Sequence, residues 1–155
     1  MLDVASISAM VAAGGVIAGV VLAILELRNI TKTRQMELIM RLYSTFITRE
    51  FQDAYETMWT TDFEDYNEVV RKGHLFRLRT IGGFFEGIGV LLHRKLVDIE
   101  VVDDLFRESI KLMWEKAKPP LCDARRRLNL PNYGRYFEYL YSEITKREKA
   151  PQAPQ

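Results

Sequence analysis

The first part of the chain is a single uninterrupted block of hydrophobic and small residues. Residues 4–25 read VASISAMVAAGGVIAGVVLAIL, with no charged side chain between Asp3 and Glu26. A helix rises about 1.5 Å per residue, so this block would be about 33 Å long, enough to cross a hydrocarbon layer of about 30 Å. The pattern predicts a transmembrane anchor over residues 1–26, a helical domain over 27–147 and a disordered tail over 148–155.

A cleaved signal peptide or a buried core helix would also produce an apolar block near the N-terminus. A core helix is usually shorter, and a signal peptide needs a basic segment before its apolar core, whereas no Lys or Arg precedes residue 4. Arg28, Lys32 and Arg34 all follow the block, and basic residues near a span stay in the cytoplasm. We therefore expect a single-pass protein of the cell membrane, with its N-terminus outside and its C-terminal domain cytoplasmic.

Small residues recur at four-residue intervals inside this predicted span, at Gly15, Gly19 and Ala23. Such a row lets two helix backbones approach closely, which is a main source of helix association in lipid. The row predicts membrane association through these residues, either in a homo-oligomer or with a partner helix. Glycine and alanine are also common in spans that associate with nothing, so both interpretations stay open.

Beyond the span, hydrophobic residues continue at spacings of three and four. They predict one helix through residues 20–61, with a bend near 29–33 and an inner face made of Met36, Ile39, Tyr43, Ile47, Phe51, Ala54 and Met58. Thr61 and Glu64 match a capping box, and Gly73 is typical of a helix end, so a short acidic helix is expected over 62–72.

The next predicted helix, over residues 74–96, has two different faces. One is apolar: Leu78, Ile81, Phe84, Phe85, Ile88, Leu92 and Leu96. Beside it lies a seam of Gly82, Glu86, Gly89 and His93, where glycines that cost helix stability indicate close contact with another helix. A buried Glu86 would need a partner, for which Arg77, Arg79 and the arginines at 125–127 are candidates. A solvent-exposed Glu86, or one with a chemical role, remains an alternative.

The sequence pattern in the last third of the chain predicts three more helices. Asp98 can cap a helix that runs to Ala117 and ends at Pro119 and Pro120. Its inner face would hold Val102, Leu105, Phe106, Ser109, Met113 and Ala117. A short basic helix is expected over 121–128, a turn over 131–134, and a final amphipathic helix that carries Tyr136, Phe137, Leu140 and Ile144. The whole is an all-α fold: one transmembrane helix that continues into a bundle of about five helices.

Composition and motifs exclude several functions. The net charge of +1 gives no global indication of a nucleic-acid partner, and Cys122 is the only cysteine. The chain has no metal-binding, phosphate-binding or dinucleotide motif, so we expect no enzyme activity, no metal, no cofactor and no small-molecule substrate. Arg125, Arg126 and Arg127 form a basic patch suited to anionic lipid, but it lacks the interleaved aromatics of a single-strand binder. No nucleic acid is expected.

Several short segments resemble a known family. They are GGFFEGIGVLLHRKLVD at 82–98, DLF at 104–106, MWE at 113–115, KPPL at 118–121 and FEYL at 137–140. These segments resemble a family of small prokaryotic proteins catalogued only as a domain of unknown function. The resemblance implies an N-terminal span and a cytoplasmic helical domain, covers the chain up to its tail, and brings no catalytic residues with it.

Two classes of function remain. The first is a non-catalytic interaction protein tethered to the lipid bilayer, either an accessory subunit of a larger membrane complex or a homo-oligomeric scaffold. The second is a membrane-anchored sensor or ligand-binding module in which Glu86 and nearby arginines contact a small ion. A homo-oligomeric channel is disfavoured, because Ser6 and Ser8 are the span's only polar side chains.

Overall fold

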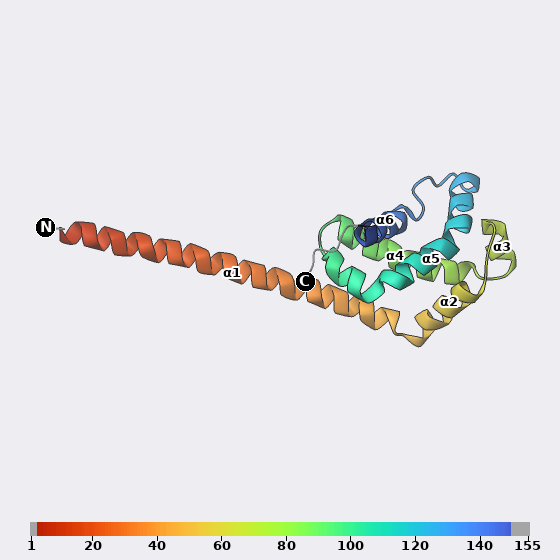
Figure 1. Ribbon diagram of the computed structural model, residues 1–155, viewed down its shortest axis with the longest axis horizontal. Coiled ribbons are helices and arrows are strands. Elements are labelled where there is room, and N and C mark those ends of the chain that lie inside the picture. Colours follow the sequence, from red (N-terminus) through yellow and green to blue (C-terminus); the bar gives the residue numbers. More distant parts are fainter. Residues whose placement is uncertain (1–2, 150–155) are drawn as a thin grey trace. The chain divides into compact units, whose positions relative to one another are not determined.

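The computed structural model describes the backbone of residues 3–149, together with the side chains of Asp3 and residues 12–149. Within this part of the chain every regular element is a helix, so the prediction of an all-α fold is confirmed (Figure 1). The elements are α1 (Val4–Phe46), α2 (Arg49–Thr60), α3 (Tyr66–Arg71), α4 (Leu75–His93), α5 (Ile99–Arg127) and α6 (Arg135–Lys149). The chain divides into two compact units, Met1–Glu37 and Leu38–Gln155.

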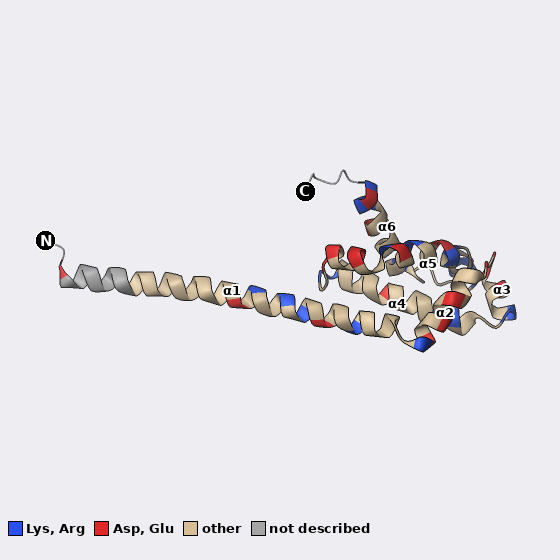
Figure 2. Cartoon of the chain, turned by 60° about the horizontal axis from the view of Figure 1, so that its bottom comes forward, with Lys and Arg blue, Asp and Glu red and all other residues tan. Residues whose placement is uncertain are grey.

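The first unit contains the N-terminal part of α1, which is long and apolar enough to span a membrane. Every described side chain from Ala12 to Arg34 is exposed, including Val16 at 67% and Leu22 at 65% of their full surface. Figure 2 shows the uncharged stretch that precedes Glu26, the first charged residue on this part of the helix. An exposed apolar surface of this kind on a soluble protein would be strongly unfavourable in water, but it is favourable in lipid.

The predicted helix over 20–61 is wrong at one point, because the structure interrupts it at Ile47 and Thr48. No bend is needed at 29–33, where α1 continues without a break. The interruption has its own polar partners: Thr48 Oγ1 accepts a hydrogen bond from the amide of Phe51, and the Gln52 side chain donates to the Phe46 carbonyl at 2.6 Å. These side chains satisfy backbone groups that a continuous helix would have paired internally.

The turn between α1 and α2 is stabilised by aromatic packing. The ring of Phe46 lies 5.3 Å from Phe51, 6.0 Å from Phe84 and 5.4 Å from Phe106, measured between centroids. A straight helix would carry Phe51 away from these rings. Because of the turn, Ile47 is 58% exposed rather than on the inner face. Met36 and Tyr43, expected on the same face, are 53% and 37% exposed.

The capping box predicted at 61–64 lies four residues too early. Thr61 is extended and ends α2, whereas Asp65 caps α3 by accepting a hydrogen bond from the Glu68 amide at 2.7 Å. Glu68 in turn accepts one from the amide of Glu64 at 2.8 Å. The predicted stop was right: Gly73 follows α3 with φ of +74°, a conformation that glycine adopts without strain.

The core of the second unit lies where α4, α5 and α6 meet. α4 packs most extensively on α6, and Phe85 stacks on Phe137 with ring centroids 5.0 Å apart. Trp114 of α5 packs edge-on against the same Phe137 at 5.1 Å. All three side chains are buried, and as predicted so are Leu140 and Ile144. The aromatic cluster fixes how the last helix lies against the bundle.

Pro119 and Pro120 do not end a helix, contrary to the prediction. α5 continues through both prolines from Ile99 to Arg127, capped as predicted by Asp98, and includes the segment expected to form a separate basic helix (Figure 1). Proline inside a helix costs about 3 kcal/mol because it lacks an amide donor and crowds the preceding turn. Here the helix buries side chains on both sides of the prolines, Ala117 before them and Leu121 after, which offsets the cost.

Three smaller expectations are also corrected. Leu105 and Leu96 are 41% and 47% exposed, so neither belongs to the inner face of its segment. α4 ends at His93, before Leu96. Glu148 and Lys149 belong to α6 rather than to a tail, and Glu148 pairs with Lys111 at 3.0 Å. The rest of the predicted tail, residues 150–155, lies outside the described part of the chain.

Candidate functional site

α4 and α6 approach each other closely at Gly89. A Cβ atom added there would lie 2.0 Å from the carbonyl oxygen of Tyr136, far inside van der Waals contact. Gly89 is buried, so nothing larger than its hydrogen fits between the two backbones. This is the close helix contact that the glycine seam led us to expect.

Glu86, one helical turn before Gly89, lies at the N-terminus of α6. Its Oε2 accepts a hydrogen bond from the backbone amide of Phe137 at 2.7 Å. α6 begins directly after Gly134, which has φ of +70° and no side chain with which to cap the helix. Glu86 therefore supplies the cap from another helix, and its negative charge is favourable next to the partial positive charge of a helix N-terminus.

The partner expected for Glu86 was wrong. None of the arginines proposed for it forms an ion pair with Glu86 among the described residues: Arg77 pairs with Asp53, and Arg125 with Glu138. A search for a positively charged side chain could not find the partner of Glu86, because the partner is a backbone amide and such an amide cannot be recognised in a sequence. Glu86 is therefore paired, as we expected, but with a backbone amide at the N-terminus of α6 instead of an arginine.

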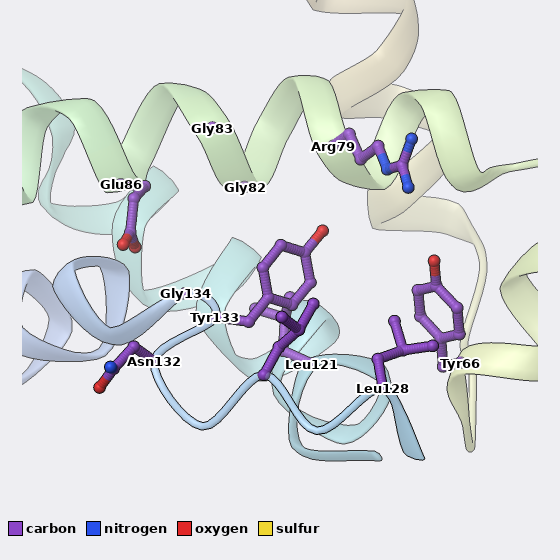
Figure 3. A pocket seen from close by; sticks show the side chains of 11 residues that line it. Tyr66, Arg79, Gly82, Gly83, Glu86, Leu121, Leu128, Asn132, Tyr133 and Gly134 are labelled. Atoms are coloured by element: carbon purple, nitrogen blue, oxygen red, sulfur yellow. The ribbon is translucent and has the colours of Figure 1, made fainter. Parts of the chain in front are cut away.

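Gly82 is not at a helix contact, although it lies on the same seam. An added Cβ would meet nothing within 4 Å, and the same is true of Gly83 and Gly87. Instead Gly82 and Gly83 line a pocket of about 410 Å³, which we call the α4 pocket (Figure 3). This volume lies within the range of about 300–1,000 Å³ that is usual for small-molecule sites.

The α4 pocket has charged groups at its ends and apolar walls between them. Arg79 and Glu86 both belong to α4 and lie at opposite ends in Figure 3. The walls come from α5 and the connection that follows it, namely Leu121, Leu128 and Tyr133, and from Tyr66 of α3. The sequence drew attention to Glu86 and Gly82 but gave no signal for the two tyrosines.

His93, the last residue of the predicted seam, is exposed at the end of α4. Its ring centroid lies 5.3 Å from those of both Tyr136 and Tyr139 of α6. The seam of Gly82, Glu86, Gly89 and His93 is therefore divided: the last three residues contact α6, whereas Gly82 borders the α4 pocket.

The three arginines of the predicted basic patch make contacts within the bundle. Arg125 pairs with Glu138 at 2.8 Å and donates from Nε to the Tyr133 carbonyl at 2.8 Å. Arg127 pairs with Asp123 at 2.8 Å, and Arg126 lies 3.6 Å from the same aspartate. These pairs neutralise part of the local charge, whereas the Arg126 side chain is 79% exposed, and contact of the patch with anionic lipid stays a prediction.

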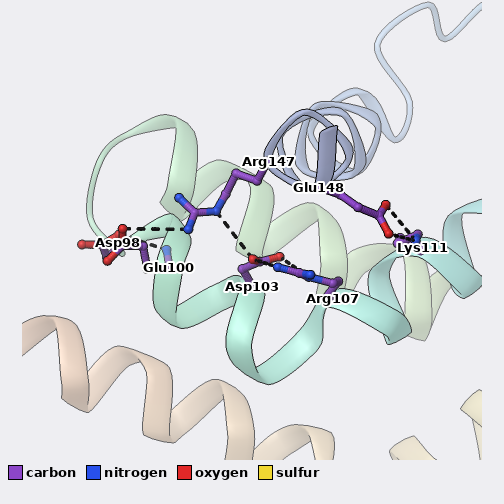
Figure 4. A network of polar contacts seen from close by, with 7 residues as sticks. All are labelled: Asp98, Glu100, Asp103, Arg107, Lys111, Arg147 and Glu148. Atoms are coloured by element: carbon purple, nitrogen blue, oxygen red, sulfur yellow. Dashed lines mark hydrogen bonds and ion pairs between the residues drawn. The ribbon is translucent and has the colours of Figure 1, made fainter. Parts of the chain in front are cut away.

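Among the side chains that the structure describes, Asp123 and Asp103 are the two charged ones that are buried, and the sequence pattern identified neither. The Arg127 guanidinium lowers the pKa of Asp123, and the amide of Tyr66 lowers it further. Arg107 likewise lowers the pKa of Asp103 through a hydrogen bond, against the opposing effect of burial, with Arg147 adding to the shift (Figure 4). This network ties the end of α6 to α5.

The predicted membrane-association residues lie in the first unit. Gly15, Gly19 and Ala23 are exposed on α1, and a Cβ added at either glycine meets nothing within 4 Å. Their role in association stays a prediction. Within the described chain, no three His, Cys, Asp or Glu side chains gather closely enough to hold a metal ion, and Cys122 is a half-buried free thiol.

Comparison with known proteins identifies the family that the sequence segments resemble. Neither the curated proteins nor the solved structures contain a match to this chain. A family model described as a domain of unknown function, DUF4760, matches residues 13–144. The match includes the apolar part of α1 from residue 13, α2 to α5, α6 as far as residue 144, and the α4 pocket. The chain thus belongs to the DUF4760 family.

Proposed function

We propose that this chain is a membrane-tethered, non-catalytic interaction protein. In this proposal the apolar part of α1 crosses the cell membrane, and the bundle acts on the cytoplasmic side through its helix faces. The observation that carries the proposal is the complete exposure of an uncharged helical stretch from Ala12 to Leu25. A lipid bilayer is the environment that makes such a surface favourable.

The flanking charges support the orientation. Arg28, Lys32 and Arg34 follow the apolar stretch directly, and positively charged residues at a span end remain on the cytoplasmic side. Glu26 does not oppose this, because acidic residues contribute little to orientation. The bundle, whose core is closed and whose surface carries many ion pairs, is suited to an aqueous compartment.

Exposed apolar residues near the start of the bundle support a role in association. Met40 and Tyr43 are 56% and 37% exposed and lie three residues apart on α1. In the sequence they share a seven-residue register with Gly15, Gly19, Leu22 and Met36, the pattern by which parallel helices pack along a common seam, and the polar residues Glu26, Asn29 and Thr33 occupy the positions between Leu22 and Met36. The occupant that fits this register is α1 of a second copy.

Membrane extraction tests the anchoring. Full-length protein should stay in the membrane pellet after alkaline carbonate washing, whereas a chain that begins at Leu38 should be released. Release of the full-length chain would contradict the proposal, because a surface-bound protein is washed away and a spanning helix is not.

Cysteine cross-linking tests the association. In a Cys122→Ser background, Met40→Cys should form a disulfide-linked dimer in membranes upon mild oxidation. Arg41→Cys, exposed on the same helix but outside the seam, is the matched control. Equal cross-linking of the two variants, or none of either, would argue against a homo-oligomer built on this seam.

A further inference from the structure

We propose that the α4 pocket binds a small, elongated zwitterion with an apolar centre. This inference is independent of whether α1 spans a membrane, because every group that carries it belongs to the bundle. The structure assigns the anionic end of the ligand to Arg79 and the cationic end to Glu86, with the leucines and tyrosines of the walls around its middle.

The charges determine the class of ligand. Arg79 is exposed at one end of the pocket and takes no part in the ion pairs among residues 12–149. Its guanidinium is a fork of donors suited to a carboxylate. At the other end, Glu86 uses Oε2 for the α6 amide, which leaves Oε1 as an acceptor for an ammonium group. One cation and one anion match a ligand that carries both charges.

The spacing determines the shape of the ligand. Arg79 and Glu86 are seven residues apart on one helix, so they lie on the same face, with about 10 Å between their Cα atoms. An α-amino acid is too short to reach both groups. A short peptide with free termini, or a linear ω-amino acid, has the required length, since an extended chain covers about 3.3–3.6 Å per residue.

The floor of the pocket explains why α4 carries glycines that no other helix contacts. Gly82 and Gly83 lie between the two charged residues, and nothing stands within 4 Å of a Cβ built on either. Each glycine costs the helix about 1 kcal/mol relative to alanine, a cost that packing at these two positions does not recover. Close approach of a ligand to the bare backbone is a reason that fits their position.

The backbone of two lining residues and the carboxylate of Glu86 are held in place by hydrogen bonds before a ligand arrives. The amide of Tyr66 donates to the buried Asp123 at 3.2 Å, and the Tyr133 carbonyl accepts from Arg125 at 2.8 Å. Glu86 is fixed by its bond to α6. Figure 3 shows the hydroxyls of both tyrosines directed toward α4, where each can donate to a ligand carboxylate. Such prior ordering lowers the entropic cost of binding.

Calorimetric titration of the full-length protein in lipid nanodiscs tests the proposal, with empty nanodiscs as the blank. The probes are the tripeptide Ala-Leu-Ala, the same peptide acetylated at its N-terminus, the same peptide amidated at its C-terminus, and 8-aminooctanoate. We expect the free tripeptide to bind and each blocked form to bind at least about tenfold more weakly, because each loses one charge-assisted contact. Binding of 8-aminooctanoate as well would show that the two charges suffice, whereas binding of the tripeptide alone would identify peptides as the source.

Two leucine substitutions on α4 distinguish the loss of binding in the pocket from a general effect of leucine on this helix. Gly82→Leu should abolish binding by filling the pocket, and Gly87→Leu should leave it unchanged, because Gly87 is on the same helix but outside the lining. Arg79→Gln should reduce the affinity of the free tripeptide to that of its C-terminal amide. The proposal is overturned if neither zwitterion binds, if a blocked peptide binds as tightly as the free one, or if Gly82→Leu binds like the parent protein.

Discussion

Two helices of this protein carry glycines at regular spacing, yet the glycines have different surroundings. On α1, a Cβ built at Gly15 or Gly19 meets nothing, whereas on α4 one built at Gly89 lies 2.0 Å from the backbone of α6. A Cβ built at Gly82, also on α4, likewise meets nothing within 4 Å, although Gly82 is half-buried and the two glycines of α1 are exposed. A row of small residues therefore shows that close approach is possible, but only the structure shows which glycine is approached and by what.

The largest expected effect distinguishes Gly89 from Gly82, two of the four glycines of α4. Gly89→Ala should destabilise the bundle by about 3 kcal/mol or prevent its folding, because the new methyl group overlaps the Tyr136 carbonyl. Gly82→Ala should instead stabilise by up to about 1 kcal/mol, because alanine is the better helix former and the space is open. Thermal unfolding of the full-length protein in detergent measures both. Equal effects of the two substitutions would refute the contrast between them.

A second effect tests the buried charge of α5. Asp103→Asn should destabilise the bundle by about 2 kcal/mol, the typical contribution of hydrogen bonds to charged groups, since it weakens the contacts with Arg107 and Arg147. Asp104→Asn, at an exposed neighbouring position, should change stability little. The measurement is again the melting temperature, with the two variants compared at neutral pH.

The same aspartates predict a pH dependence. The folded-state pKa values of Asp103 and Asp123 lie below the ordinary value, so their stabilisation is fully present above the unfolded pKa of about 3.9 and is lost as the pH falls through the folded values. Melting temperature should therefore fall steeply below about pH 4, and less steeply in Asp103→Asn. Identical acid profiles for the variant and the parent would show that Asp103 is not responsible.

Much of the fold could be predicted from the sequence where one local signal acted alone. The Asp98 cap, the stop at Gly73 and the burial of Phe137, Leu140 and Ile144 were of this kind. The errors came where two signals competed. Thr61 and Asp65 both begin a capping pattern, and only the second is used, because Thr61 ends the preceding helix.

Two other predictions were wrong for a different reason. The helix end expected at the prolines of α5 and the arginine partner expected for Glu86 both depend on tertiary contacts. Burial of Leu121 and Ala124 beyond Pro119 and Pro120 maintains a helix that local propensity would end. Glu86 is paired with a backbone amide of α6, and the α4 pocket is bordered by Tyr66 and Tyr133 from distant parts of the chain. None of these neighbours can be identified from spacing along the sequence.

A smaller effect tests the cap that Glu86 provides. Glu86→Gln should destabilise the bundle by about 1 kcal/mol, since the amide oxygen can still accept the Phe137 hydrogen bond but the charge at the helix terminus is lost. Glu56→Gln, an exposed position on α2, is the control and should be neutral. A loss of about 3–5 kcal/mol in Glu86→Gln would instead indicate a buried ion pair.

The smallest effect on the stability of the bundle is expected for a substitution in α1. Gly19→Leu should leave the melting temperature of the bundle unchanged, because a Cβ built at Gly19 meets no atom of the described residues within 4 Å. The same substitution should reduce the dimer fraction measured by mass in mild detergent, because Leu keeps two helix backbones apart. A loss of bundle stability in this variant would contradict the separation of the two units.

The central claim is that α1 crosses the membrane with the bundle on the cytoplasmic side, and cysteine labelling in intact cells tests it most directly. In a Cys122→Ser background, Asp3→Cys should react with a membrane-impermeant maleimide added outside. Ser44→Cys, exposed on the same helix beyond the span, should react only after the cells are permeabilised. Labelling of Ser44→Cys from outside would reverse the orientation, and equal protection of both positions in intact cells would contradict the span itself.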